Sequence, residues 1–81
     1  MKILNEQQLR QDIETYKSMF PSSYTTFEKL LDYLKADYSD GASGGVIGFE
    51  VSSEWDNKCY GFEYKGNQPD ITYEYVGIVK C

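Results

Sequence analysis

The stretch FEYKGNQPDITYEY, residues 62–75, decides how this chain folds. Aromatic residues alternate with polar ones on both sides of a Gly-Asn-Gln-Pro break, a pattern typical of a β-hairpin with one buried face. A tight turn would set Glu63 against Asp70 and place Pro69 inside the ladder, and both are unfavourable. A four-residue loop instead opposes Lys65 to Asp70, so we expect this second register. The same register opposes Tyr64 to Ile71, Phe62 to Tyr73 and Tyr60 to Tyr75.

The segment before this hairpin has the same alternation, with large residues at every second position from Ile47 to Val51. Asp56 and Asn57 can form a two-residue turn, which places Phe49 opposite Tyr64. The same register opposes Val51 to Phe62 and Trp55 to Lys58. We therefore expect three strands, at about 46–55, 58–65 and 70–79, in an antiparallel meander.

Two amphipathic helices are expected before the strands, at about 5–20 and 25–38, because apolar residues recur there every three or four positions. Asn5 with Gln8, and Thr25 with Glu28, have the spacing of capping boxes. Residues 41–45, GASGG, form a Gly-rich joint. A phosphate-binding loop would need a strand before the glycines and a helix after them, and here the order is reversed.

At 81 residues the chain is predicted to be one domain, spanning 1–81. A chain of this length buries only about 60–65% of its unfolded surface, which leaves no room for a large enclosed cavity. The predicted fold is α+β (ααβββ), with both helices packed on one face of the three-stranded sheet. The inward tyrosines are interpreted as core, because a base-stacking role would leave the helices without a surface to cover.

The charge balance restricts the function. The chain has 13 acidic and 8 basic residues, a net charge of −5 and no histidine. Direct binding to nucleic acid or to anionic membrane is therefore disfavoured, and a partner with a basic surface is favoured. The lack of histidine argues against zinc sites and Ser/His or Cys/His catalysis. We expect no enzyme activity, no cofactor and no metal. The N-terminus resembles no signal peptide, so a cytoplasmic location is expected.

The cysteines, Cys59 and Cys81, can form a disulfide on count alone. In the predicted registers, however, Cys59 points outward opposite Val76, whereas Cys81 has the parity of the core face. A bridge would require the terminus to curl across the sheet edge. We therefore expect two free thiols.

The sheet face away from the helices is the candidate working surface. In the predicted registers Glu50 lies directly opposite Glu63, an arrangement that is mildly destabilising. The candidate partner-binding residues are Glu50, Glu54, Glu63, Glu74, Val76 and Ile78. Three interpretations of this face remain open: a solvated surface that aids solubility, a docking surface for a basic or amphipathic partner, and a homodimer contact.

These observations predict a small acidic protein-binding module that blocks the nucleic-acid-binding surface of a basic partner, such as a nuclease. By size and charge it resembles immunity proteins and the anti-defence inhibitors of phages and mobile elements, which block a basic surface, and we expect it to act as a nucleic-acid mimic. The alternative is a structural homodimer or assembly subunit that uses Val76, Ile78 and the edge of the third strand. A ligand binder or small enzyme would need a deeper pocket than this length provides.

Overall fold

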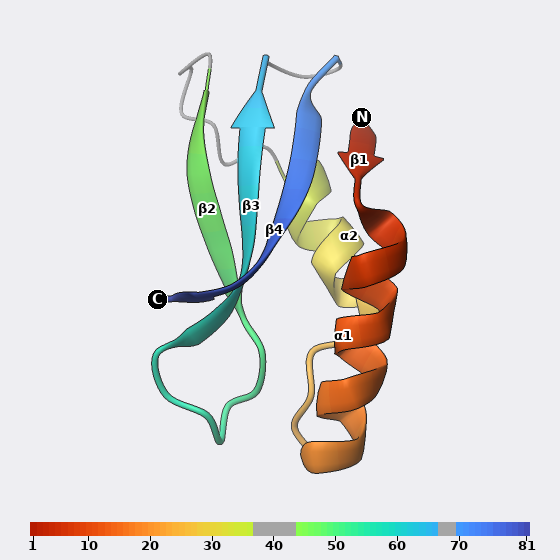
Figure 1. Cartoon of the computed structure of the whole chain (residues 1–81), viewed down its shortest axis with the longest axis vertical. Coiled ribbons are helices and arrows are strands. Elements are labelled where there is room, and N and C mark those ends of the chain that lie inside the picture. Colours follow the sequence, from red (N-terminus) through yellow and green to blue (C-terminus); the bar gives the residue numbers. More distant parts are fainter. Residues whose placement is uncertain (37–43, 67–69) are drawn as a thin grey trace.

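The structure is a computed structural model that describes residues 1–36, 44–66 and 70–81. Its elements are β1 (Lys2–Leu4), α1 (Glu6–Met19), α2 (Phe27–Lys35), β2 (Gly44–Glu50), β3 (Lys58–Lys65) and β4 (Thr72–Lys80) (Figure 1). The α+β class is as predicted, but the three-stranded antiparallel meander is wrong. The sheet has four strands in the order β1-β4-β3-β2, and β1 runs parallel to β4.

The additional strand, β1, lies at the start of the chain and pairs with Thr72–Glu74 of β4. Its ladder continues into a hydrogen bond from the N–H of Lys2 to the carbonyl of Ile71, at 3.1 Å. Ile3 faces the core together with Tyr73, its partner in the register. Because β1 is only three residues long, it carries too little alternation to be recognised in the sequence.

Both helices present an apolar stripe to the sheet, but their N-termini differ from the predicted capping boxes. Asn5 has a left-handed backbone (φ 63°), and its side chain donates to the carbonyl of Tyr75 instead of capping α1. The N-cap of α2 is Thr26, whose hydroxyl accepts the N–H of Lys29 at 3.2 Å. The predicted end of the second helix (37–38), the start of the glycine joint (41–43) and residues 67–69 of the predicted hairpin loop lie outside the described residues.

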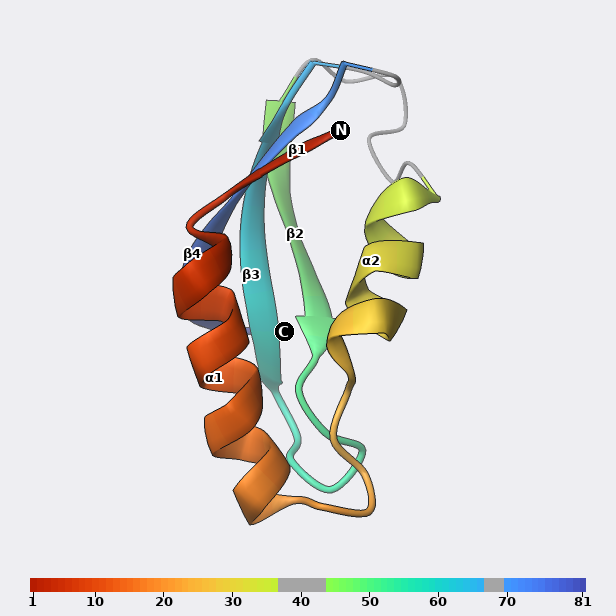
Figure 2. The ribbon, with the colours of Figure 1, turned by 90° about the vertical axis from the view of Figure 1, so that its right-hand side faces the viewer.

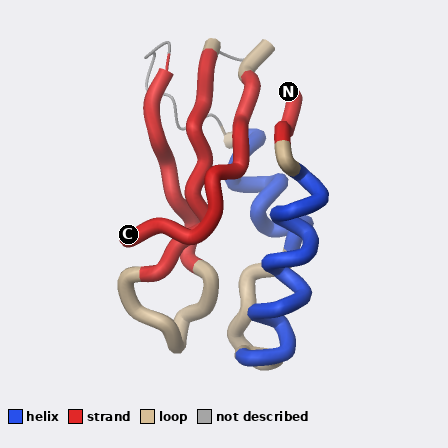
Figure 3. Tube along the Cα trace, in the orientation of Figure 1, coloured by secondary structure: helices blue, strands red, loops and turns tan. Residues whose placement is uncertain are grey.

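The first hairpin is longer than the predicted two-residue turn. β2 ends at Glu50, and Phe49 pairs with Tyr60, not with Tyr64. The cause is the segment between the helices, which pairs with the next two residues. The carbonyl of Val51 accepts the backbone N–H of Thr25, and Ser52 forms a β-bridge with Tyr24. Figure 3 shows the resulting loop between β2 and β3. Farther along this loop Trp55 packs on the rings of Tyr16 and Phe20, at centroid distances of 5.2 and 5.7 Å.

The second hairpin is shifted by two residues from the predicted register. Phe62 pairs with Tyr75 and Tyr64 with Tyr73, so the aromatics keep the predicted face while Glu63 falls opposite Glu74. Asp70 and Ile71 precede β4, and Ile71 is fully buried. The predicted pairing of Lys65 with Asp70 is therefore wrong. Lys65 pairs with Thr72.

A β-bulge interrupts β4 directly after this aromatic stretch. Gly61 pairs with Gly77 and Tyr60 with Ile78, which leaves Val76 as the extra residue. Gly77 has φ 100°, a conformation that favours glycine. The bulge changes which residues point inward, so Ile78 packs against the core and Val79 pairs with Cys59 on the opposite face.

The core lies between the helices and one face of the sheet. In Figure 2, α1 lies on the side of β4 and α2 on the side of β2. Two tyrosine hydroxyls bind the helices to the sheet: Tyr73 donates to the carbonyl of Leu34 at 3.0 Å, and Tyr75 donates to the Asp12 carboxylate at 2.5 Å. The fully buried side chains include Leu9, Leu30, Leu34, Val51, Tyr60, Phe62 and Ile71.

Candidate functional site

The face of the sheet opposite the helices, called here the outer face, consists of rows of residues that lie side by side across the strands. One row carries Glu63 and Glu74, a second consists of glycines, and a third leads to the C-terminus. These three rows are Leu4-Glu74-Glu63-Val46, Gly77-Gly61-Gly48 and Val79-Cys59-Glu50, and a fourth contains Lys2, Thr72 and Lys65. The glycine row therefore separates Glu50 from the other two glutamates of this face.

The acidic pair of this surface is Glu63 with Glu74, not Glu63 with Glu50 as predicted. Glu63 and Glu74 are direct partners in the β3–β4 ladder, and Glu63 is exposed while Glu74 is half-buried. Neither glutamate forms an ion pair within the described parts of the chain. The pair is flanked in its row by exposed apolar residues, Val46 at 65% exposure and Leu4 at 37%.

The other predicted site residues lie apart from this pair. Glu50 is exposed on the outer face but pairs with Cys59. Glu54 lies in the loop between β2 and β3, where its carboxylate accepts a hydrogen bond from Ser23. Val76, at the bulge, is exposed at 44%. Ile78 packs against the core, so its predicted place on the outer surface is wrong.

A disulfide joins Cys59 to Cys81, with Cα atoms 5.5 Å apart. The prediction of free thiols is wrong. Because of the bulge, Val79 lies on the same face of the sheet as Cys59, and Cys81, two residues later, lies on that face too. The N–H of Cys81 also donates to the carbonyl of Asn57 at 3.2 Å. The C-terminus is thereby fixed to the start of β3 (Figure 1).

Within the core, two tyrosines, Tyr60 and Tyr75, have pKa values raised above the ordinary tyrosine value. Burial raises the pKa of the Tyr75 hydroxyl, and the hydrogen bond to Asp12 raises it further. Burial and the charge of Asp12 also raise the pKa of Tyr60. The Tyr60 hydroxyl is buried and has no hydrogen-bond partner among the described residues. Both hydroxyls are therefore held in their neutral form.

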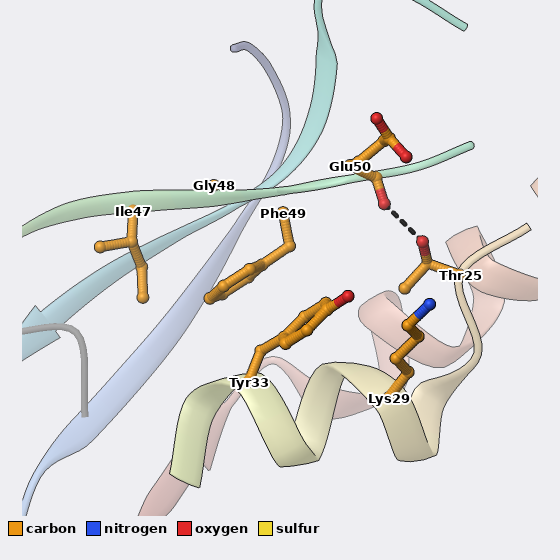
Figure 4. Close-up of a pocket in the computed structure, with 7 residues that line it drawn as sticks. All are labelled: Thr25, Lys29, Tyr33, Ile47, Gly48, Phe49 and Glu50. Atoms are coloured by element: carbon orange, nitrogen blue, oxygen red, sulfur yellow. Dashed lines mark hydrogen bonds between the residues drawn. The ribbon is translucent and has the colours of Figure 1, made fainter. Parts of the chain in front are cut away.

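A groove of about 510 Å³ lies between α2 and the edge strand β2, and the sequence did not reveal it. Figure 4 shows Tyr33 projecting from α2 toward Phe49 of β2, while Lys29 extends toward Thr25 at the Glu50 end of the groove. The rings of Tyr33 and Phe49 are stacked, with centroids 5.1 Å apart. The Glu50 carboxylate points away from the helix, and only its backbone carbonyl faces the groove, where it accepts a hydrogen bond from Thr25 at 2.6 Å (Figure 4).

No group of three or more acidic or cysteine side chains is placed to hold a metal ion within residues 1–36, 44–66 and 70–81. No helix in the described part of the chain is both long enough and apolar enough to cross a membrane. The prediction that the protein is not an enzyme stays a prediction.

Comparisons with known proteins add no further constraint. No protein family model matches the chain, and no match was found among curated proteins or solved structures.

Proposed function

We propose that this protein is a protein-binding module whose outer sheet face docks on a cationic surface of a partner protein. The observation that carries the proposal is the direct pairing of Glu63 with Glu74 on neighbouring strands, on a sheet face that neither described helix covers (Figure 2). Like charges placed directly opposite destabilise a sheet, and a cationic partner would remove this cost. The exposed side chains of Val46 and Leu4 at either end of the row provide apolar contact beside the charges.

Lysines on the same face do not cancel the acidic pair. Lys65 and Lys2 lie in the adjacent row, on either side of Thr72. Neither forms an ion pair with Glu63 or Glu74 in the described structure. The outer face therefore presents a negative row next to a positive one, a pattern that would orient a partner as well as attract it.

The role that we propose for this docking is inhibition. A net charge of −5 favours association with surfaces that otherwise hold nucleic acid, because such surfaces are cationic. A protein occupying that surface would exclude the nucleic acid. The partner class that we propose is a nuclease or another nucleic-acid-binding protein.

The test is affinity capture from the source cells with three forms of the protein. The first is the unchanged chain, and the second carries Glu63→Lys and Glu74→Lys. The third is a matched control with Glu14→Lys and Glu28→Lys, which changes exposed helix residues and alters the net charge by the same amount. A partner retained by the control but lost by the outer-face variant supports the proposal, and competition by DNA or RNA for that partner supports inhibition. Equal retention by all three forms contradicts the proposal.

The homodimer alternative also stays a prediction, but parts of the contact surface predicted for it are already used within the fold. Residues 72–74 at the predicted edge of β4 are already paired with β1, and Ile78 packs against the core. Light scattering at several protein concentrations would test the alternative, since a monomer at all of them contradicts a homodimer.

The cytoplasmic location likewise stays a prediction, and the disulfide weighs against it. Thiols in the cytosol are kept reduced, and structural disulfides persist mainly in oxidising compartments. Alkylation of thiols in freshly lysed source cells, followed by mass spectrometry of the Cys59 and Cys81 peptides, distinguishes the cytoplasm from an oxidising compartment. Alkylated cysteines would support the cytoplasm, and an intact bridge would support an oxidising compartment.

A further inference from the structure

Within residues 1–36, 44–66 and 70–81, no strand pairs with the edge of β2 that faces away from β3. The N–H of Val51 donates to the carbonyl of Lys58, which fixes the alternation of the antiparallel ladder. Residues at odd positions of β2 direct their backbone groups to β3, and those at even positions direct them outward. The outward groups of Val46 and Gly48 have no partner among the described residues.

This edge lacks the features that protect exposed strand edges. Natural edges are kept short or carry lysine, proline or inward-pointing charges. β2 reads GGVIGFE over Gly44–Glu50, and its only charged residue is at the end. The opposite edge of the sheet is the three-residue β1, which begins with Lys2. An open apolar edge of this length is a template for another strand.

The chain itself already pairs along this edge at its end. Tyr24 forms an antiparallel bridge with Ser52, and the Thr25 hydroxyl binds the outward carbonyl of Glu50. The chain then turns into α2 at Thr26, its N-cap. The space beyond, along Ile47, Gly48 and Phe49, is the groove between β2 and α2.

The side chains around the groove specify what a new strand should carry. An antiparallel strand bonded to Val46 and Gly48 would point its alternate side chains toward α2 at the positions opposite Ile47 and Phe49. Tyr33, Ile47 and Phe49 offer apolar contact there. Lys29 is the only cationic side chain lining the groove, and it has no ion-pair partner among the described residues. It also lies in the first turn of α2, where the helix dipole favours an anion.

We propose that this groove binds an extended segment of a partner protein by strand addition to β2. The bound segment carries an acidic residue that faces Lys29 and, two positions later, an apolar residue that faces Tyr33 and Ile47. The groove lies on the helix side of β2 and the Glu63–Glu74 pair lies on the outer face, so the proposal goes beyond the inhibitory docking proposed above. Val46 takes part in both, through its backbone here and through its side chain on the outer face. Main-chain hydrogen bonds supply affinity in this mode, and alternate side chains supply specificity.

The probe is a capped seven-residue peptide with glutamate at its second position, valine at its fourth and sixth, and threonine elsewhere. Titration of this peptide into the isotope-labelled protein should shift the amide resonances of β2 and α2. N-methylation of the third and fifth peptide residues blocks the bonds to Gly48 and Val46, so it should abolish these shifts. Shifts confined to the outer face, or unaffected by N-methylation, would contradict strand addition.

The protein variant that tests the backbone contribution is Val46→Pro. Val46 is exposed and its N–H points outward, so proline removes a donor from the free edge without removing a hydrogen bond of the fold. We expect peptide affinity to fall about tenfold, since one ladder bond is lost and the ring obstructs the strand. Val46→Thr is the matched control, because it keeps the N–H and should bind as the unchanged chain does. Equal affinity in both variants overturns the proposal, provided that their melting curves show both are folded.

The charge contribution is tested by Lys29→Glu, which should also weaken binding about tenfold. A peptide with lysine in place of its glutamate should recover that loss, and failure to recover it contradicts the assignment of Lys29. Light scattering without peptide tests whether a second copy of this chain occupies the edge instead. A dimer that Val46→Pro dissociates would show that a second copy occupies the edge, which overturns the proposal of a foreign segment.

Discussion

The two faces of the sheet differ in whether their polar groups have bonding partners within the chain. On the inner face, the hydroxyls of Tyr73 and Tyr75 each have a partner on a helix. On the outer face, Glu63 and Glu74 lie together with no cation bound to either in the described structure. The inner face is thus largely complete within the chain, while the outer face gains from a partner outside it.

Adjacent residues of β3 should give the largest contrast between the faces. Phe62 is fully buried and contacts the rings of Phe49 and Tyr75, whereas Glu63 is exposed. Phe62→Ala should lower the free energy of unfolding by about 3–5 kcal/mol, because it leaves a cavity. Glu63→Ala should change it by less than about 0.5 kcal/mol. Urea denaturation measures both values, and similar losses would contradict the assignment of the faces.

The disulfide should give the next largest effect, and it belongs to the outer face. Cys59 and Cys81 are 22 positions apart, and a crosslink of this span stabilises by about 3 kcal/mol through the unfolded state. Reduction should lower the urea midpoint accordingly. The double variant Cys59→Ala and Cys81→Ala serves as the control, because its curve should not respond to reductant. An unchanged midpoint after verified reduction would contradict a stabilising role.

High pH should destabilise the fold through two tyrosines of the inner face. Burial is the first cause that raises the pKa of both Tyr60 and Tyr75 above the ordinary value of 10.0. Their contribution is complete below pH 10 and is lost as pH rises, because the unfolded chain releases these protons first. Each should reduce the free energy of unfolding by about 1.4 kcal/mol per pH unit above 10. Denaturation at pH 9 to 11 measures the slope, and Tyr60→Phe should make it shallower.

The two tyrosines should also differ from one another at neutral pH. Tyr75→Phe removes the hydrogen bond to Asp12 and should cost about 1–2 kcal/mol. Tyr60→Phe removes a buried hydroxyl that has no partner among the described residues, so it should be neutral or stabilising by about 1 kcal/mol. Thermal melting of both variants measures the difference. A larger loss for Tyr60→Phe would show that its hydroxyl has a partner, for example a buried water.

The smallest expected effect is on the acidic pair. Glu63→Lys replaces a like-charge pair with an opposite-charge pair across the strands, which should stabilise the fold by about 0.2–1 kcal/mol. The same substitution should weaken partner docking if the proposed function is correct. Glu50→Lys is the control, since Glu50 pairs with Cys59 and should gain no such stability. Equal gains for both would show that only the net charge matters.

The sequence predicted features that depend on a repeated pattern. The helical stripe through Leu9 and Ile13 and the alternation of Phe62 with Glu63 each repeat, and burial follows them. The registers failed because Lys65 was set opposite Asp70 to keep Pro69 out of the ladder and to satisfy a charge preference that is worth only tenths of a kcal/mol. Packing of several aromatic rings outweighs it.

Features made by single residues or by tertiary contact could not be predicted in the same way. The three residues of β1 are too few for a periodic signal. The bulge had one local indication, a glycine inside a strand at Gly77, but glycine alone does not fix where the extra residue lies. The groove depends on how α2 lies beside β2, and the early end of β2 depends on Thr25, which is 26 positions before Val51 in the chain.

The bulge at Val76 has a consequence for how this chain can change over evolution. Deleting one residue there would turn Ile78 toward solvent and Cys81 toward the core side, and the cysteines would no longer share a face. The disulfide therefore depends on the extra residue at the bulge, Val76, as well as on its two cysteines. In homologues, the length of this segment and the presence of both cysteines should be gained or lost together.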